Sequence, residues 1–220
     1  MEIKVLKNIL GVNEQIAKEN RSLLDSKGIF ALNIMSSPGA GKTSLILETI
    51  RELDSEFKIG VIEGDIASSI DAEKIGAKGI PVIQINTGGA CHLDANMVSS
   101  ALKNLPLDTI KLLFIENVGN LICPGEFELG EHKKVILLST PEGDDKPYKY
   151  PLLFRIADVV VVSKTDLLPY LNFNMDNFVK AVRTINQKAS IIPLSAAKGQ
   201  GLGDWFSWLK GVLTGGKRDA

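Results

Sequence analysis

The chain has 220 residues, of which 45% are hydrophobic and 23% are charged, and its formal net charge is −1. This length is enough for one sizeable hydrophobic core and short for two, and the composition is ordinary for a soluble globular domain. The nearly balanced charge gives no global attraction to nucleic acid or to a membrane surface. Two cysteines do not make a disulfide framework, and a reducing compartment would keep them as thiols.

The sequence shows no sign of a membrane segment or of several domains. No apolar run approaches the ~18–20 residues that span a bilayer. Residues 1–15, MEIKVLKNILGVNEQ, mix charge into the apolar positions and do not read as a signal peptide, so we expect a cytoplasmic protein. The sequence holds no internal repeat, low-complexity tract or linker rich in Pro, Gly and Ser. We therefore expect a single domain over residues 1–220.

Short apolar runs alternate along the chain with amphipathic segments, which predicts an α/β fold. We expect an N-terminal helix at about 12–26, and later helices at 43–53, 70–77, 93–105, 173–187 and 204–213. Strands buried on both faces are expected at 30–35, 59–62, 81–85, 112–115, 135–138, 159–162 and 191–194. This alternation gives right-handed crossovers and a mostly parallel, roughly seven-stranded sheet with helices on both faces. Ligands are expected at the carboxyl ends of the strands.

Residues 36–43, SSPGAGKT, join the first predicted strand to a predicted helix, the context that a phosphate-binding loop requires. Gly39 and Gly41 can take positive φ and lie against phosphate oxygens, where a Cβ would clash. The N–H groups that follow, at a helix N-terminus, converge on the anion. Lys42 would reach the β and γ phosphates, and the Thr43 hydroxyl would take a Mg²⁺ position.

The loop departs from the pattern G-x-x-x-x-G-K-S/T at Ser36, which stands where the first glycine belongs. This departure is acceptable if Ser36 keeps a negative φ at the end of its strand. We therefore predict a P-loop NTPase domain. The predicted phosphate contacts come from one continuous segment: Gly39, Ala40, Gly41, Lys42, Thr43 and Ser44.

Residues 163–166, SKTD, follow a predicted strand and are close to the guanine signature N-K-x-D. The carboxylate of Asp166 can accept the N1–H and 2-amino hydrogens of guanine, and adenine offers no such donor pair. Lys164 would lay its aliphatic stem over the ring. Ser163 replaces the expected Asn, so affinity or rigidity is expected to suffer while the choice of guanine is kept.

A second segment, LSAAK at 194–198, also follows a predicted strand. The backbone of Ser195 and Ala196 would reach the guanine oxygen. An ATPase or a small-molecule kinase remains the alternative at this point.

Two acidic residues at strand ends are candidates for magnesium binding and hydrolysis. Asp65 follows the run 59–62, and Glu116 follows 112–115 in a layout typical of a Walker B. Because Mg²⁺ prefers carboxylate oxygen, Asp65 is the first candidate, and Glu116, acting through water, is the second. The predicted catalytic residues are Lys42, Asp65 and Glu116, with Thr43 as a further magnesium ligand. No Gln is evident for positioning water and no arginine finger is evident, so slow turnover is expected.

The cysteines lie in loops that follow predicted strands. Cys91 and His92 stand in NTGGACHLDA, and Cys123 stands in ENVGNLICPGE. These three ligands are one short of the four of a closed Zn²⁺ site, but a symmetric dimer would double the set. Tetrahedral Zn²⁺ and square-planar Ni²⁺ both suit such ligands. Spacing alone favours incidental thiols over a metal site, and it indicates a surface position for His132.

With these residues in hand, the chain resembles the HypB family of hydrogenase nickel incorporation proteins, which are GTPases of the dimerising P-loop class. The form S-S-P-G-x-G-K-T is common in that family, so Ser36 is no departure from it. The matching segments, spread over residues 34–201, are SSPGAGKTS, EGDIASS, NTGGACHLDA, LLFIENVGNLICP, FELGEHKKVILLSTPEGDDKPYKYP and SKTDLLPY.

The resemblance implies slow GTP hydrolysis, a GTP-dependent homodimer, and a nickel or zinc site at the dimer interface built by Cys91, His92 and Cys123. It also implies two partners, a second nickel chaperone of the HypA type and a hydrogenase large-subunit precursor. Some members carry an N-terminal Cys-rich or His-rich nickel motif, whereas residues 1–30 contain neither residue type. High-affinity nickel storage at this end is therefore not expected.

The expected function is that of a GTP-switched metallochaperone that hands nickel to a hydrogenase precursor. Two alternatives stay open. One is a urease accessory GTPase of the UreG type, although its metal motif is C-P-H, whereas this chain has C-H and a separate C-P. The other is a nucleotide-gated metal-binding module with negligible turnover.

Overall fold

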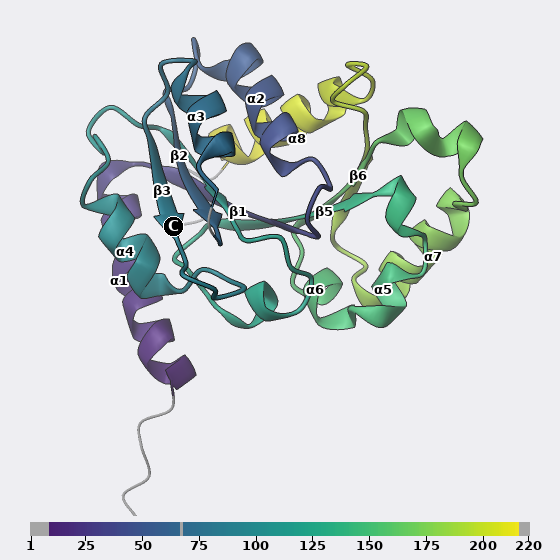
Figure 1. Cartoon of the computed structure of the whole chain (residues 1–220), viewed down its shortest axis with the longest axis horizontal. Helices are drawn as coiled ribbons and strands as arrows, with labels where there is room; N and C mark the ends of the chain where they lie inside the picture. The colour runs from purple at the N-terminus through teal and green to yellow at the C-terminus, as the bar shows by residue number, and fades with distance from the viewer. Residues whose placement is uncertain (1–8, 67, 216–220) are drawn as a thin grey trace, which may run out of the picture.

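The computed structural model describes residues 9–66 and 68–215, and its centre is a seven-stranded sheet (Figure 1). Every neighbouring pair of strands is parallel, in the order β3-β2-β4-β1-β5-β6-β7. All seven predicted runs form strands. Their bounds are β1 Phe30–Ser36, β2 Ile59–Asp65, β3 Val82–Asn86, β4 Leu112–Glu116, β5 Lys133–Ser139, β6 Val159–Ser163 and β7 Ser190–Pro193.

Helices cover both faces of the sheet. Figure 1 shows α2, α3 and α8 on one face and α1, α4, α6 and α7 on the other. None of the helices in the described part of the chain is long and apolar enough to cross a bilayer. The helices are α1 Ile9–Lys27, α2 Lys42–Leu53, α3 Ile70–Gly76, α4 Ala95–Leu102, α5 Lys146–Lys149, α6 Pro151–Arg155, α7 Met175–Ile185 and α8 Leu202–Gly215.

The predicted bounds of α4 are wrong at both ends. Asp94 caps the helix by accepting a hydrogen bond from the N–H of Met97 at 2.7 Å, so the helix begins at Ala95 rather than at 93. It ends at Leu102, three residues before the predicted end. Leu93 lies outside the helix, and its N–H donates instead to the side chain of Asn117 at 3.1 Å.

The short helices α5 and α6 were not among the predicted helices, and their first turns hold the two prolines of residues 146–151, KPYKYP. Proline is tolerated there because the first N–H groups of a helix have no partner inside it.

The core forms two layers, one on each face of the sheet. Strand residues alternate between the layers, as the pleat requires. On the α2 face, Trp205 of α8 is fully buried and donates its indole N–H to the hydroxyl of Thr49 in α2 at 2.9 Å. The helix that follows the P-loop, α2, is therefore bonded to α8, its neighbour on the same face of the sheet.

His132 is not a surface residue, contrary to the prediction. Its Nδ1 accepts a hydrogen bond from the N–H of Ala31 at 2.9 Å, and its Nε2 lies 2.8 Å from Oδ1 of Asp25 at the end of α1. The ring stacks on Phe30 with centroids 4.7 Å apart, and the side chain is 15% exposed. Burial lowers the pKa of His132, and the hydrogen bond with Asp25 opposes that fall. The ring joins α1 to the sheet.

Candidate nucleotide and metal sites

The phosphate-binding loop runs from the end of β1 to the start of α2. Gly39 and Gly41 have φ of +71° and +105°, which a side chain would strain. Ser36 is still part of β1, and it is not among the described residues with positive φ. The ammonium of Lys42 is buried and lies 3.2 Å from the Ser36 hydroxyl. The loop thus offers a phosphate group two things: the backbone conformation at Gly39 and Gly41, and the buried cation of Lys42.

At the start of α2, the Thr43 hydroxyl donates a hydrogen bond to Oε1 of Glu116 at 2.9 Å. Glu116 ends β4 and is only 3% exposed. Burial raises the pKa of Glu116 to about 7, and the charge of Lys42 opposes that rise. Two of the three predicted magnesium residues are therefore in direct contact.

A second buried carboxyl group, Glu63 in β2, was missed by sequence analysis. It is the register partner of Glu116 in the parallel pairing of β2 with β4. Burial raises the pKa of Glu63 to about 8, and the negative charges of Glu116 and Asp65 add to that rise. The available signal was its position two residues before Asp65, which places both side chains on the same face of the strand.

These acidic residues line a cavity of about 240 Å³ at the carboxyl ends of β2 and β4. Within the described ranges, Oε2 of Glu63 and Oε2 of Glu116 are buried without a hydrogen-bond partner. Mg²⁺ prefers carboxylate, hydroxyl and water oxygens, so this donor set fits a magnesium ion bound beside phosphates. The residues around the cavity are Pro38, Gly39, Lys42, Glu63, Gly64, Asp65, Ile66, Asp71, Glu116, Asn117, Val118 and Gly119.

A separate cavity of about 260 Å³ lies on the other side of the P-loop and contains the residues predicted to bind the base. Lys164 crosses toward the loop, and its ammonium donates to the carbonyl oxygen of Gly39 at 2.7 Å. The lining residues are Ala40, Gly41, Ser44, Leu45, Leu137, Ser163, Lys164, Asp166, Leu167, Leu194, Ser195, Ala196 and Ala197.

Ser163 provides a tether that sequence analysis did not foresee. Its hydroxyl donates to the carbonyl oxygen of Ala40 at 2.6 Å, so the shorter side chain still joins β6 to the P-loop. Lys164 follows with φ of +58°, and the Thr140 hydroxyl holds the carbonyl oxygen of Lys164 at 2.8 Å. The N–H of Ser195 already donates to the carbonyl oxygen of Gln200 at 2.8 Å. Of Ser195 and Ala196, the two residues predicted to reach the guanine oxygen, Ala196 is therefore the better candidate to donate its N–H.

The predicted metal ligands meet. The ligand atoms of Cys91, His92 and Cys123 lie within 4.8 Å of one another, and the Cys91 sulfur is 3.8 Å from Nδ1 of His92. The His92 ring stacks on Phe127 with centroids 4.0 Å apart. The hydrogen bond with Cys91 raises the pKa of the Cys123 thiol. The three residues fit a site for a soft or borderline metal ion that still needs a ligand from elsewhere.

Residues 116–123 connect the nucleotide site to this cluster. The Asn117 side chain accepts from the N–H of Leu93, directly after His92. Gly119 packs on the P-loop so closely that a Cβ there would lie 2.8 Å from Cα of Pro38. The Asn120 side chain donates to the carbonyl oxygen of Cys91 at 3.2 Å. One short segment therefore carries Cys123 and contacts both the P-loop and the loop of Cys91 and His92.

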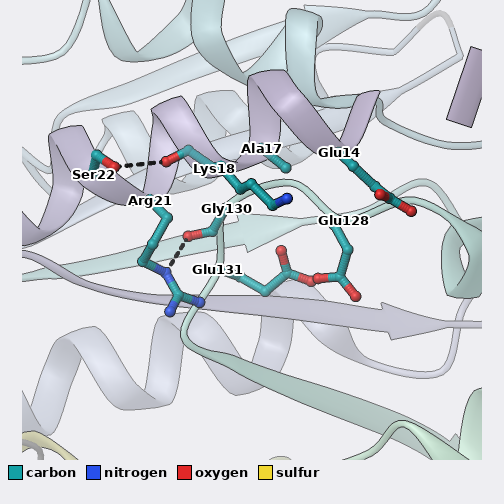
Figure 2. Close-up of a pocket in the computed structure, with 8 residues that line it drawn as sticks. All are labelled: Glu14, Ala17, Lys18, Arg21, Ser22, Glu128, Gly130 and Glu131. Carbon is teal, nitrogen blue, oxygen red and sulfur yellow. Dashed lines mark hydrogen bonds between the residues drawn. The ribbon is translucent and has the colours of Figure 1, made fainter. Parts of the chain in front are cut away.

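A larger cavity, of about 460 Å³, lies away from these sites between α1 and the loop at 128–131 (Figure 2). Arg21 extends from α1 and donates to the carbonyl oxygen of Gly130 at 2.9 Å. The buried carboxylate of Glu131 accepts from Asn33 and from the N–H of Leu129. None of the predicted site residues lines this cavity.

The comparisons with known proteins agree on one family. The family model for the CobW/HypB/UreG nucleotide-binding domain matches residues 30–193. Hydrogenase maturation factor HypB of Azotobacter vinelandii is 47% identical over 208 residues, which cover 94% of this chain and 69% of that protein. The crystal structure of HypB from Archaeoglobus fulgidus matches with a TM-score of 0.87 at 40% identity, covering 92% of this chain and 99% of that one. HypB from Helicobacter pylori, solved in complex with nickel, gives 0.89 at 37%, with 93% and 96% covered.

A parallel sheet with a phosphate-binding loop after its first strand and acidic residues at the neighbouring strand ends defines a P-loop nucleotide-binding domain. The family model matches residues 30–193, so this assignment covers most of the chain. The chain belongs to the HypB family of hydrogenase maturation factors. The UreG-type alternative is set aside, because the relatives that cover almost the whole chain are hydrogenase maturation factors.

Proposed function

We propose that the protein is a GTP-hydrolysing metallochaperone for nickel insertion during the maturation of nickel–iron hydrogenase. The observation that carries the proposal is the placement of two sites at one edge of the sheet. Residues 116–123 carry Cys123 and link the P-loop, through Pro38, to the cluster of Cys91, His92 and Cys123. A cavity lined by Asp166 lies on the other side of the P-loop and supports guanine as the proposed base. The family membership and the nickel-bound relative from Helicobacter pylori support the choice of pathway and metal.

GTP would occupy the two cavities on either side of the P-loop. Asp166 selects guanine through its N1–H and 2-amino hydrogens, and Lys164 covers the ring. The phosphates lie on the N–H groups at the start of α2, with Lys42 as their cation. The proposed nucleotide contacts are Gly39, Ala40, Gly41, Lys42, Thr43, Ser44, Lys164, Asp166, Ser195 and Ala196.

Hydrolysis rests on Lys42, Asp65 and Glu116. Mg²⁺, held by Thr43, Asp65 and Glu116, would neutralise the charge that develops on the phosphates. The residues that line the acidic cavity include no Gln and no Arg, which are the groups that position water or stabilise the transition state in fast GTPases. We therefore expect slow intrinsic turnover.

Cys91, His92 and Cys123 would bind nickel or zinc at the interface of a GTP-dependent homodimer. A two-fold axis doubles a set of three ligands that is otherwise one short. GTP binding would order the loops beside Asp65 and Glu116, and hydrolysis would release them and alter the metal site. Residues 1–220 would act as one GTPase domain in the cytoplasm, with a HypA-like chaperone and a hydrogenase large-subunit precursor as partners.

A nucleotide competition tests the guanine assignment. GTP should displace a fluorescent guanine nucleotide far better than ATP does. Asp166→Asn should remove most of this preference, because an amide cannot accept both guanine hydrogens. An unchanged preference in Asp166→Asn would rule out the assignment.

Phosphate release separates a GTPase from a metal-binding module with negligible turnover. Single-turnover release should be measurable with the unaltered chain and should fall to background with Lys42→Ala. Equal release from the two proteins would contradict the enzymatic part of the proposal.

Metal binding tests the second part of the proposal. Cys91→Ala and Cys123→Ala should each weaken nickel and zinc binding, and unchanged binding in these variants would refute the proposed metal site.

A further inference from the structure

The carboxyl group of Glu63 belongs to the magnesium side of the nucleotide site, although it was not among the predicted ligands. Glu63, Asp65 and the register partner Glu116 lie on one face of neighbouring parallel strands. Val61 precedes Glu63 on that face and packs in the same hydrophobic cluster as residues of α2. Glu63 therefore faces the helix whose first turn carries Lys42 and Thr43.

The fold places this carboxyl group out of water without giving it an internal partner. Glu63 is 3% exposed, and its Oε2 atom has no hydrogen-bond partner within residues 9–66 and 68–215. The buried ammonium of Lys42 is directed to the Ser36 hydroxyl. A buried oxygen acceptor without a donor is destabilising, so a purely structural role does not account for an acid at this position.

The cavity that Glu63 lines is also lined by Lys42, Asp65 and Glu116. Glu116 already accepts the hydroxyl of Thr43 through Oε1, and its Oε2 is the second unpartnered buried oxygen. Two neighbouring strands, β2 and β4, thus each carry a buried carboxyl oxygen without a hydrogen-bond donor, beside the loop that would bind phosphates. A molecule or hydrated ion that enters the cavity could donate hydrogen bonds to these two oxygens.

A hydrated divalent cation supplies such donors. Mg²⁺ gives up its waters reluctantly and is bound in nucleotide sites by one or two protein groups, phosphate oxygens and several waters. Each of those waters presents hydrogens that need acceptors, and carboxylates outside the first ligand shell commonly accept them. We propose that Glu63 is an outer-sphere ligand that accepts hydrogen bonds from waters of the nucleotide-bound magnesium ion. This inference rests on the proposed function, because it requires guanine nucleotide and Mg²⁺ to bind here.

The test is the Mg²⁺ dependence of nucleotide binding by the full chain, measured with a fluorescent GDP in chelator and across a magnesium titration. Glu63→Gln keeps the shape of the side chain, cannot ionise, and replaces one carboxyl oxygen by an amide NH₂. Without Mg²⁺, it should bind GDP at least as tightly as the unaltered protein does, because no carboxylate at this position then repels the phosphates. The magnesium concentration needed for half-maximal tightening should rise about 10- to 100-fold, the range seen when outer-sphere partners of metal sites are removed.

Two further variants make the result decisive. Glu63→Met removes the acceptor while keeping an unbranched side chain of similar length, and it should raise the magnesium requirement as Glu63→Gln does. Glu73→Gln removes a charge from an exposed position of α3, where the carboxylate accepts from the Ser69 hydroxyl, and it should leave the titration unchanged.

An unchanged magnesium requirement in both Glu63 variants would overturn the inference and leave the proposed function intact. An equal shift in Glu73→Gln would also overturn it, because loss of negative charge would then explain the effect. If the unaltered chain bound guanine nucleotide with no Mg²⁺ dependence, the proposed function and this inference would fail together.

Discussion

The hydroxyl of Ser163 donates to the carbonyl oxygen of Ala40 at 2.6 Å, across the gap between β6 and the P-loop. The contact joins the segment that would bind the base to the loop that would bind the phosphates. The serine at this position of the guanine signature therefore joins β6 directly to the P-loop.

We expect Ser163→Ala to weaken guanine nucleotide binding about 2- to 10-fold, which corresponds to the ~0.5–1.5 kcal/mol of a typical hydrogen bond. The measurement is the dissociation rate of a fluorescent GDP, which should rise because the P-loop loses its anchor to β6. Ser22→Ala, on the exposed side of α1, is the matched control. An unchanged rate in Ser163→Ala would show that Lys164 alone holds the loop.

Gly119→Ala should disrupt nucleotide binding through a steric effect. The new Cβ would lie 2.8 Å from Cα and 2.9 Å from N of Pro38, which are backbone atoms that cannot rotate away. We expect at least a 10-fold loss of GDP affinity, because the P-loop must shift. Gly203→Ala adds a Cβ with no atom within 4 Å and should leave GDP affinity unchanged. If the two variants bound GDP with the same affinity, the close packing of Gly119 on Pro38 would not be needed for nucleotide binding.

Asn120 should matter for metal affinity although it is not a ligand. Its amide donates to the carbonyl oxygen of Cys91, and its Oδ1 accepts from the N–H of Ile122, so it fixes the two loops relative to each other. Asn120→Ala should weaken nickel and zinc binding about 10-fold, in the range found for residues that support metal ligands. Competition with a chromogenic chelator measures this. Asn104→Ala, in the exposed turn after α4, should bind as the unaltered chain does, and equal affinities in all three proteins would contradict the prediction.

Stability should depend on pH through His132. Burial lowers its pKa below the ordinary value of 6.5, so the unfolded chain takes up a proton more readily than the folded protein does. The stabilising contribution is therefore complete above pH 6.5 and is lost as the pH falls through the lower, folded-state pKa.

Urea unfolding at pH 7.5 and at pH 5.5 measures this effect. His132→Asn keeps an acceptor for the N–H of Ala31 and does not titrate. We expect it to be less stable than the unaltered chain at pH 7.5, because it loses the stacking on Phe30, and to lose less stability at pH 5.5. The same loss of stability between the two pH values in both proteins would exclude His132 as the source.

The sequence was sufficient for the seven strands, because short runs of Val, Ile and Leu between polar segments have few alternatives to a parallel sheet. It was also sufficient to bring Cys91 and Cys123 together, since each follows a strand that ends at the same edge. It was not sufficient for the bounds of α4. The first residue of that helix depends on two side-chain contacts: Asp94 caps the helix, and Asn117 accepts a hydrogen bond from the N–H of Leu93.

The position of His132 illustrates a different limit. Its neighbours in sequence are charged and suggest a surface position. The acid that binds it, Asp25, is 107 residues away and ends a different element. Glu63 was missed for a related reason, because its burial depends on the pairing of β2 with β4 rather than on its own strand.

The common direction of the strands also has a practical consequence. The groups proposed for nucleotide and metal binding lie at the carboxyl ends, whereas the amino ends are preceded by exposed lysines at Lys58, Lys111 and Lys188. A surface handle built at one of these lysines would immobilise the molecule by its opposite side. The P-loop and the Cys–His–Cys cluster would then face the solution, free for nucleotide, metal and partner proteins to reach.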